Sequence, residues 1–188
     1  ITGDHGFVNV HTVVAPNVWL VEAGLMDAAD DRGDWRATFH TAGGAAFLHL
    51  AEPGDQRTLE KVRRALDEQP PRLRKLFRIV ERQELDAIGA APEAELALAG
   101  FLGVAFTADG AGEAVRPGSG GTHGYFPSDF SEIHTGFVGW GSGFASGGFD
   151  AHLIGLEDVA PLIADLLGVE LETYDGTAPS GLLVSPPE

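Results

Sequence analysis

The chain has 188 residues, of which 28 are acidic and 12 basic, so its formal net charge is −16. This length suits one domain, and a hydrophobic content of 44% is enough to build an apolar core, which excludes a disordered acidic tail. The absence of cysteine excludes disulfides, thiolate metal sites and a cysteine nucleophile. The excess of carboxylates argues against a nucleic-acid polymer as partner, and no apolar run is long enough to predict a membrane span.

Hydrophobic periodicity predicts mixed helices and strands, and hence an α/β fold. The first expected elements are an extended stretch, a helix, a hairpin with a Gly-Gly turn, and an amphipathic helix, at residues 7–14, 16–25, 35–51 and 58–69. A strand, a helix and two strands follow at residues 75–80, 81–88, 94–99 and 103–108. The last part should hold a flexible connector, two strands and a helix ended by a glycine, at residues 110–121, 132–140, 151–154 and 158–167.

Most of the basic residues lie in one segment. Residues 57–82 contain nine of the twelve, with four acids, so their local net charge is +5 while the rest of the chain sums to −21. Such a segment can collect an anionic substrate, or it can be a solvated helix face with compensating pairs such as Glu60 and Arg64. The second interpretation is favoured, because charge runs on helices are commonly solvated.

Two short segments hold a histidine between glycines where strands should end. They are Gly-Asp-His-Gly, with Asp4 and His5, and Gly-Thr-His-Gly-Tyr, with His123. A carboxylate and an imidazole suit Zn²⁺, Mn²⁺ or Fe, although an Asp-His pair in a turn can also be a hydrogen-bonded loop feature. Because open α/β sheets collect ligands at the carboxyl ends of their strands, we expect Asp4, His5 and His123 to converge. A nucleophile elbow, a phosphate-binding P-loop and a zinc helix are absent.

Four segments in order resemble the C-terminal portion of the alkaline phosphatase superfamily, in its nucleotide pyrophosphatase/type I phosphodiesterase branch. They read GDHGF from Gly3, GTHGY from Gly121, GWGSGF from Gly139 and EDVAPLIADLLGV from Glu157. The resemblance implies part of an alkaline-phosphatase-like central sheet flanked by helices, with an inserted α+β cap. It divides the chain into a core segment at 1–29, the cap at 30–115 and a second core segment at 116–188.

The resemblance further implies a two-metal phosphoric ester hydrolase, with Zn²⁺ as the expected ion and Mn²⁺ as the alternative. Asp4 and His5 would then bind one ion and His123 the second. Gly3 stands where the family usually has serine, and the family's Thr or Ser nucleophile and its other ligands lie upstream of the Asp-His-Gly turn. We therefore expect a missing N-terminal part of the same enzyme, a nucleotide-like or other phosphate ester substrate, and little activity or metal binding by this chain alone.

The sequence is also compatible with other interpretations. Phosphomutase or sulfatase chemistry would keep the fold and change the nucleophile, and a binding or scaffold domain would keep the three ligands only as relics. Of the other histidines, His40 and His49 are expected as a surface pair on the hairpin and His11 as a neighbour of the metal turn. His134 and His152 are expected as ordinary polar residues, and Trp19, Trp35 and Trp140 as packing residues. The resemblance is compatible with export, but the localisation is left open.

Overall fold

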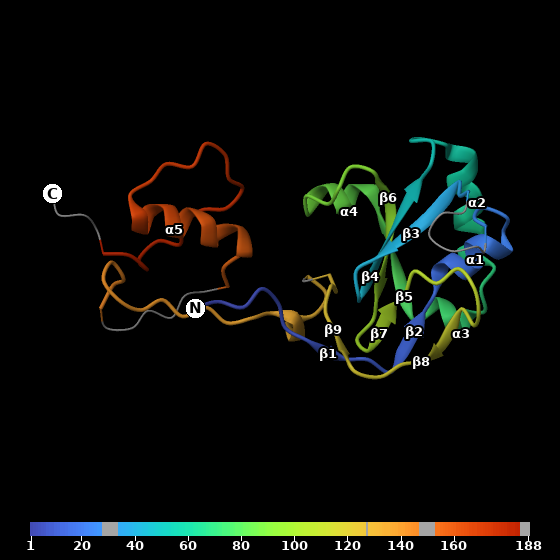
Figure 1. The fold of residues 1–188 in the computed structure, drawn as a ribbon, viewed down its shortest axis with the longest axis horizontal. Helices are drawn as coiled ribbons and strands as arrows, with labels where there is room; N and C mark the ends of the chain where they lie inside the picture. Colours follow the sequence, from blue (N-terminus) through green and yellow to red (C-terminus); the bar gives the residue numbers. More distant parts are fainter. Residues whose placement is uncertain (28–33, 127, 147–152, 185–188) are drawn as a thin grey trace. The chain divides into compact units, whose positions relative to one another are not determined.

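The computed structural model describes residues 1–27, 34–126, 128–146 and 153–184, which form two compact units. The larger unit is His5–His134, and the smaller one joins Ile1–Asp4 to Thr135–Glu188. Strands and helices are mixed in the larger unit, so the predicted α/β class is confirmed (Figure 1). None of the helices in this described part of the chain is both long and apolar enough to cross a bilayer.

The main sheet has four antiparallel strands in the order β3-β4-β6-β5. Their bounds are Ala37–Thr41, Ala45–Leu50, Ala94–Gly100 and Phe77–Glu81. Strands β3 and β4 form the predicted hairpin, in which Gly43 adopts a φ of +69° that favours glycine. One face of the sheet packs through Phe39, Leu48 and Leu98 against Trp19 and Leu59. The other packs through alanines against Leu85 and Phe126.

Four helices surround this sheet, namely α1 (Pro16–Glu22), α2 (Gln56–Asp67), α3 (Pro71–Arg74) and α4 (Arg82–Ala87). Helix α2 is capped at its N-terminus by Asp55, whose side chain accepts a hydrogen bond from the Thr58 N–H. Its predicted apolar stripe, Leu59, Val62 and Leu66, is buried. In the basic segment Arg63 pairs with Glu81 at 2.6 Å, which supports the expectation of compensated charges but not the particular pair suggested by the sequence.

A smaller sheet has the order β7-β2-β8, with bounds Val104–Phe106, Thr12–Val14 and Val115–Pro117. Strand β2 pairs with β7 in parallel and with β8 antiparallel. A two-stranded ladder joins β1 (Val8–Asn9) to β9 (Gly121–Thr122). The predicted connector at 110–121 is therefore wrong in part, because it contains β8 and the first residue of β9. The partners of both strands lie about a hundred residues earlier, so the pairing leaves no local periodicity.

The strand predicted at 132–140 is also wrong. The chain instead forms a 3-10 turn, η1 (Ser131–Ile133), and its extended part makes only an isolated bridge between Thr2 and Phe137. Glycines interrupt this stretch, and a strand depends on packing and pairing with neighbours. The strand predicted at 151–154 lies partly outside the described residues, and Leu153 and Ile154 are not in a strand.

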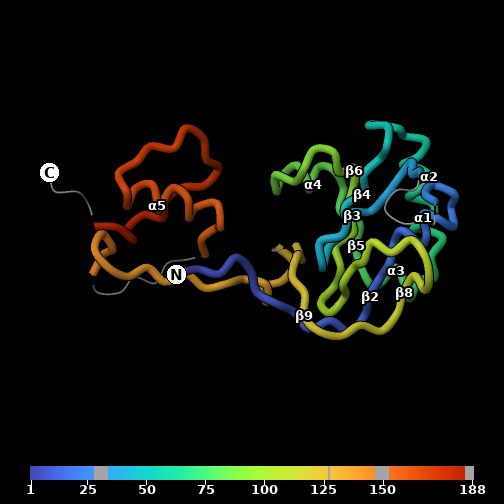
Figure 2. Tube along the Cα trace, viewed as in Figure 1, coloured from blue at the N-terminus to red at the C-terminus, as the bar shows by residue number. Residues whose placement is uncertain are grey.

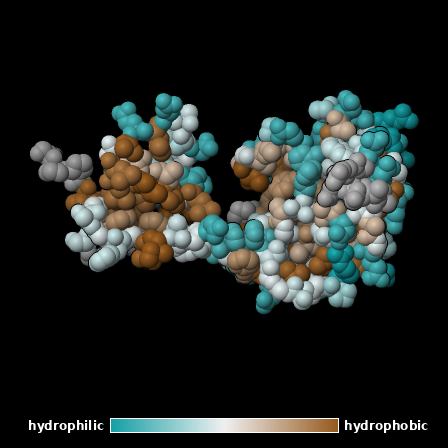
Figure 3. All heavy atoms as spheres, viewed as in Figure 1, coloured by the Kyte–Doolittle hydropathy of each residue, from teal (hydrophilic) through white to brown (hydrophobic). Residues whose placement is uncertain are grey.

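The smaller unit is built around η2 (Leu156–Asp158) and α5 (Val159–Leu167). Helix α5 ends as predicted at Gly168, with a φ of +65°. Apolar side chains gather on the surface of this unit (Figure 3), and Trp140, predicted as a packing residue, is 92% exposed. Trp19 is buried as predicted, whereas Trp35 is partly exposed.

The two compact units do not coincide with the division predicted from the sequence. Compactness measures contacts within the folded chain, whereas an inserted cap is defined by comparison with relatives. The division into core segments at 1–29 and 116–188 with a cap at 30–115 therefore stays a prediction.

Candidate metal site

The ladder between β1 and β9 brings the two glycine-flanked histidines together. Val8 lies opposite Thr122 and Asn9 opposite Gly121 in antiparallel register. His5 precedes β1 and His123 follows β9, so both residues lie at the same end of the ladder. Figure 2 shows the N-terminal segment, in blue, passing beside β9. Two positions that are 118 apart in the sequence thus become neighbours through a pairing of only two residues a strand.

The two imidazole rings are stacked. Their centroids are 3.8 Å apart, and their planes differ by 11°. The ring of Phe7 meets both edge-on, at 5.0 Å from His5 and 5.6 Å from His123. The predicted convergence of these two histidines is confirmed, while Asp4 belongs to the smaller unit and its role as a ligand stays a prediction, as do the ligand roles of His5 and His123.

The turn at His5 is held by its neighbouring glycine. The Gly6 N–H donates to the Ile133 carbonyl at 2.7 Å, and a Cβ on residue 6 would lie 2.7 Å from the Glu132 carbonyl oxygen. The Nδ1 of His5 lies 3.0 Å from the Gly6 carbonyl oxygen, which can only accept, so Nδ1 carries the proton. In that tautomer the neutral ring carries its lone pair on Nε2, which is the kind of donor that a metal ion binds.

The donor atoms fit a divalent transition metal in kind but not in number. Imidazole nitrogens, with a carboxylate beside them in the sequence at Asp4, are typical ligands of Zn²⁺. Among residues 1–27, 34–126, 128–146 and 153–184, however, no three His, Asp or Glu side chains are grouped so as to hold an ion. The arrangement can therefore contribute ligands to a metal site, and further ligands are needed to complete one.

The remaining histidines are placed elsewhere. His40 and His49 form the expected pair on the hairpin, with centroids 4.6 Å apart, and burial and then the nearby His40 lower the pKa of His49. His11 packs against Gly103, and its Nδ1 lies 2.9 Å from the Thr12 hydroxyl. His134 follows η1, and His152 lies outside the described residues.

Sequence reasoning missed two residues beside this ring pair. Phe7 is 66% exposed although it is a large apolar residue, and its place directly after Asp-His-Gly was the available signal. Tyr125 belongs to the Gly-Thr-His-Gly-Tyr motif, and its side chain is buried, which raises the pKa of its phenol. The ring of this buried aromatic, two residues after His123, lies against Gly44 of the hairpin turn.

No protein-family profile and no curated protein sequence matches this chain. Solved structures do match. Human ectonucleotide pyrophosphatase/phosphodiesterase 5 superposes with a TM-score of 0.62 at 16% identity, over 94% of this chain and 42% of that chain. The murine ectonucleotide pyrophosphatase/phosphodiesterase 5 gives a TM-score of 0.61 at 16% identity with the same coverage. The chain thus spans less than half the length of these structures, and it is similar in fold to part of a nucleotide pyrophosphatase/phosphodiesterase, as its four motifs imply.

Proposed function

We propose that this chain is the C-terminal part of a two-metal phosphoric ester hydrolase, either a phosphodiesterase/nucleotide pyrophosphatase or a phosphatase. The observation that carries the proposal is the stacking of His5 and His123 at 3.8 Å, since two imidazoles so close can serve adjacent ions. The similarity in fold to structures named as phosphodiesterases gives independent support. Asp4 and His5 would hold one ion and His123 the second, with Zn²⁺ as the expected metal.

The roles of these side chains follow from the demands of phosphoryl transfer. Two bound cations supply positive charge that offsets the charge on the transferring oxygens and favours ionisation of the attacking group. His5 contributes through Nε2, because its Nδ1 proton is engaged by the Gly6 carbonyl, which also fixes the direction of the ring. Asp4 contributes negative charge, which neutral imidazoles cannot, and so raises the affinity for a dication.

The set is incomplete in this chain. Two ions need more donors than three side chains provide, and the proposal places the Thr or Ser nucleophile and the remaining ligands in an upstream part of the same polypeptide. The substrate class that fits is a phosphate ester or a nucleotide-like small molecule. On this basis the chain alone binds divalent ions weakly and does not turn over phosphate esters.

Activity of the longer polypeptide encoded by the same gene tests this proposal. Hydrolysis of p-nitrophenyl esters should be assayed with Zn²⁺ or Mn²⁺, using a phosphodiester, a phosphate monoester and a sulfate ester. We expect metal-dependent turnover of a phosphate ester, lost in His5→Ala and His123→Ala and kept in His40→Ala, which alters a histidine outside the site.

The outcomes are distinct. Preferred turnover of the sulfate ester would point to sulfatase chemistry. A gene without an upstream segment, or a longer polypeptide inactive on all three esters, would contradict the proposal. Turnover by residues 1–188 alone, abolished by His123→Ala, would show that the catalytic set is complete in this chain and that the expectation of missing residues is wrong.

A further inference from the structure

The turn that carries His123 rests on the β3–β4 hairpin turn, residues 42–44. The Gly44 N–H donates to the His123 carbonyl at 2.7 Å. A Cβ on Gly43 would lie 2.3 Å from that same carbonyl oxygen, and a Cβ on Gly124 would lie 1.8 Å from the Ala42 carbonyl oxygen. Both glycines have positive φ, +69° and +78°, so the two turns approach backbone to backbone at positions where only glycine fits.

The hairpin turn is itself fixed to the core. The Gly43 carbonyl accepts from the Phe106 N–H at 2.7 Å, and the Gly44 carbonyl accepts from the Gly100 N–H at 2.9 Å. Gly100 ends β6 and Phe106 ends β7, so this turn is hydrogen-bonded to a strand of the main sheet and to a strand of the three-stranded sheet. These two hydrogen bonds hold the turn in place, and with it the Gly44 N–H that donates to the His123 carbonyl.

The ring of Tyr125 fills the space above Gly44. A Cβ on Gly44 would lie 2.5 Å from the Tyr125 Cγ and 2.6 to 2.7 Å from both Cδ atoms. Tyr125 is 3% exposed, and its ring packs edge-on against Phe130 at 5.9 Å. Because Cγ lies on the Cβ–Cγ axis, rotation of the ring about that bond cannot relieve such a contact. Either the whole ring must leave its buried place beside Phe130 by rotation about the Cα–Cβ bond, or the main chain of residues 123–125 must move.

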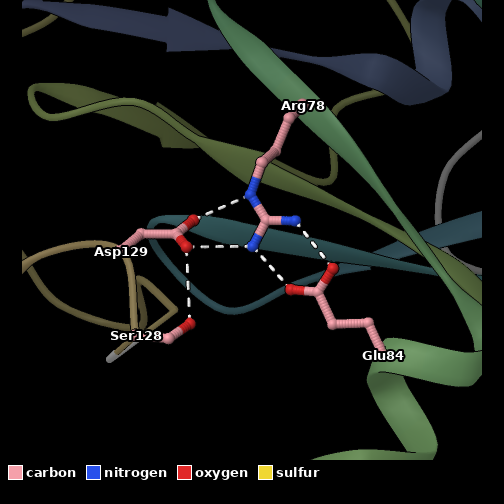
Figure 4. A network of polar contacts seen from close by, with 4 residues as sticks. All are labelled: Arg78, Glu84, Ser128 and Asp129. Carbon is pink, nitrogen blue, oxygen red and sulfur yellow. Dashed lines mark hydrogen bonds and ion pairs between the residues drawn. The ribbon is translucent and has the colours of Figure 1, made fainter.

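A second anchor holds the segment after His123 (Figure 4). The Arg78 guanidinium on β5 forms two hydrogen bonds with Glu84 of α4 and two with Asp129, at 2.7 to 3.0 Å. It also lies 5.4 Å over the ring of Phe126. Both anchors come from residues 30–115, the segment that the sequence suggested as a cap.

We propose that the β3–β4 turn positions His123 for metal binding, with Gly44 and Tyr125 as positioning residues. This rests on the proposed function, which assigns His123 as a ligand. The segment 30–115 then supports the turn that carries His123. Mutations in the hairpin turn would change the metal affinity without altering any ligand, as is found for groups that orient metal-binding histidines.

The experiment compares Gly44→Ala with two matched variants in the 188-residue chain. Gly110→Ala adds the same methyl group in the same unit, where its nearest neighbour would be at an ordinary 3.6 Å. Tyr125→Phe keeps the ring that meets Gly44. Nuclear Overhauser contacts between the His5 and His123 rings report the metal-free geometry, and histidine ring ¹⁵N shifts during Zn²⁺ titration report the affinity.

We expect Gly44→Ala to weaken the ring-to-ring contacts and to reduce Zn²⁺ affinity roughly tenfold. Gly110→Ala and Tyr125→Phe should leave both unchanged. A folded Gly44→Ala chain with unaltered ring contacts would overturn the proposal. Because the chain alone is expected to bind Zn²⁺ weakly, the titration continues to a large excess of the ion. If neither histidine shifts even then, the proposed ligand roles and with them the proposed function fail, while the ring contacts still decide the positioning role.

Amide exchange in the unaltered chain decides the matter if Gly44→Ala does not fold. The Gly44 N–H should be protected to the same degree as core amides such as that of Leu48, because it donates to the His123 carbonyl. Exchange of Gly44 at the rate of an exposed turn would overturn the proposal.

Discussion

Asn17 joins the first part of the chain to the predicted cap, and its replacement tests whether they fold together. Its buried side chain accepts a hydrogen bond from the Phe39 N–H at 2.7 Å and donates to the carbonyls of Phe39 and Ala108, each at 3.1 Å. Phe39 lies on β3, an edge strand of the main sheet. The amide of Asn17 thus hydrogen-bonds the N–H and the carbonyl of Phe39 on the open edge of the sheet, as a neighbouring strand would.

Asn17→Ala should lower the free energy of unfolding by about 3 kcal/mol. Phe39 is 1% exposed, so both its N–H and its carbonyl would lose their partner away from water. Each buried polar group left without a partner costs about 1–3 kcal/mol. A loss of about 3 kcal/mol is a large share of the roughly 5–15 kcal/mol by which a domain is stable.

Urea unfolding followed by circular dichroism measures the effect. Asn9→Ala, at an exposed position in β1, is the control and should change stability by less than about 0.5 kcal/mol. Asn17→Asp should cost more at neutral pH than at low pH, because its carboxylate would face two carbonyl oxygens. A change below about 0.5 kcal/mol in Asn17→Ala would refute the reasoning that this amide closes the sheet edge.

Arg78→Met should lower stability by about 1–2 kcal/mol in the same assay, because two carboxylates lose a charged partner that is only partly screened by solvent. Burial and the neighbouring His40 lower the pKa of His49, so the unfolded chain takes up this proton more readily than the folded one. The free energy of unfolding should therefore be unaffected by His49 above about pH 6.5 and should fall as the pH drops below that value. His49→Gln should make this decrease in the free energy of unfolding smaller by a few tenths of a kcal/mol. Midpoints of urea unfolding at about pH 7 and about pH 5 measure the difference. A chelator should leave the melting temperature of the chain unchanged and lower that of the longer polypeptide, as calorimetry of both would show.

Elements with a strong local signal were predicted correctly. The Gly-Gly pair marked the hairpin turn, the spacing of Leu59, Val62 and Leu66 marked the buried face of α2, and Gly168 marked the end of α5. In each case the residues that specify the element lie within or directly beside it. Local periodicity and turn chemistry are then sufficient.

Elements that depend on distant partners were missed. Strands β8 and β9 have only three and two residues, and they form because β2 and β1 lie beside them. The meeting of His5 and His123 could be expected from their matching glycine turns, but the support from Gly44 could not. Glycine at position 44 predicted a turn, and no local pattern shows that Tyr125 would fill the space it leaves.

Anomalous X-ray diffraction from crystals of the longer polypeptide with zinc tests the central claim most directly. We expect two zinc peaks about 3.5–4 Å apart, one bonded to His5 and the other to His123 at about 2.0–2.1 Å. Asp4 should bind the same ion as His5. Zinc peaks with neither histidine within bonding distance, or one ion held only by His40 and His49, would contradict it.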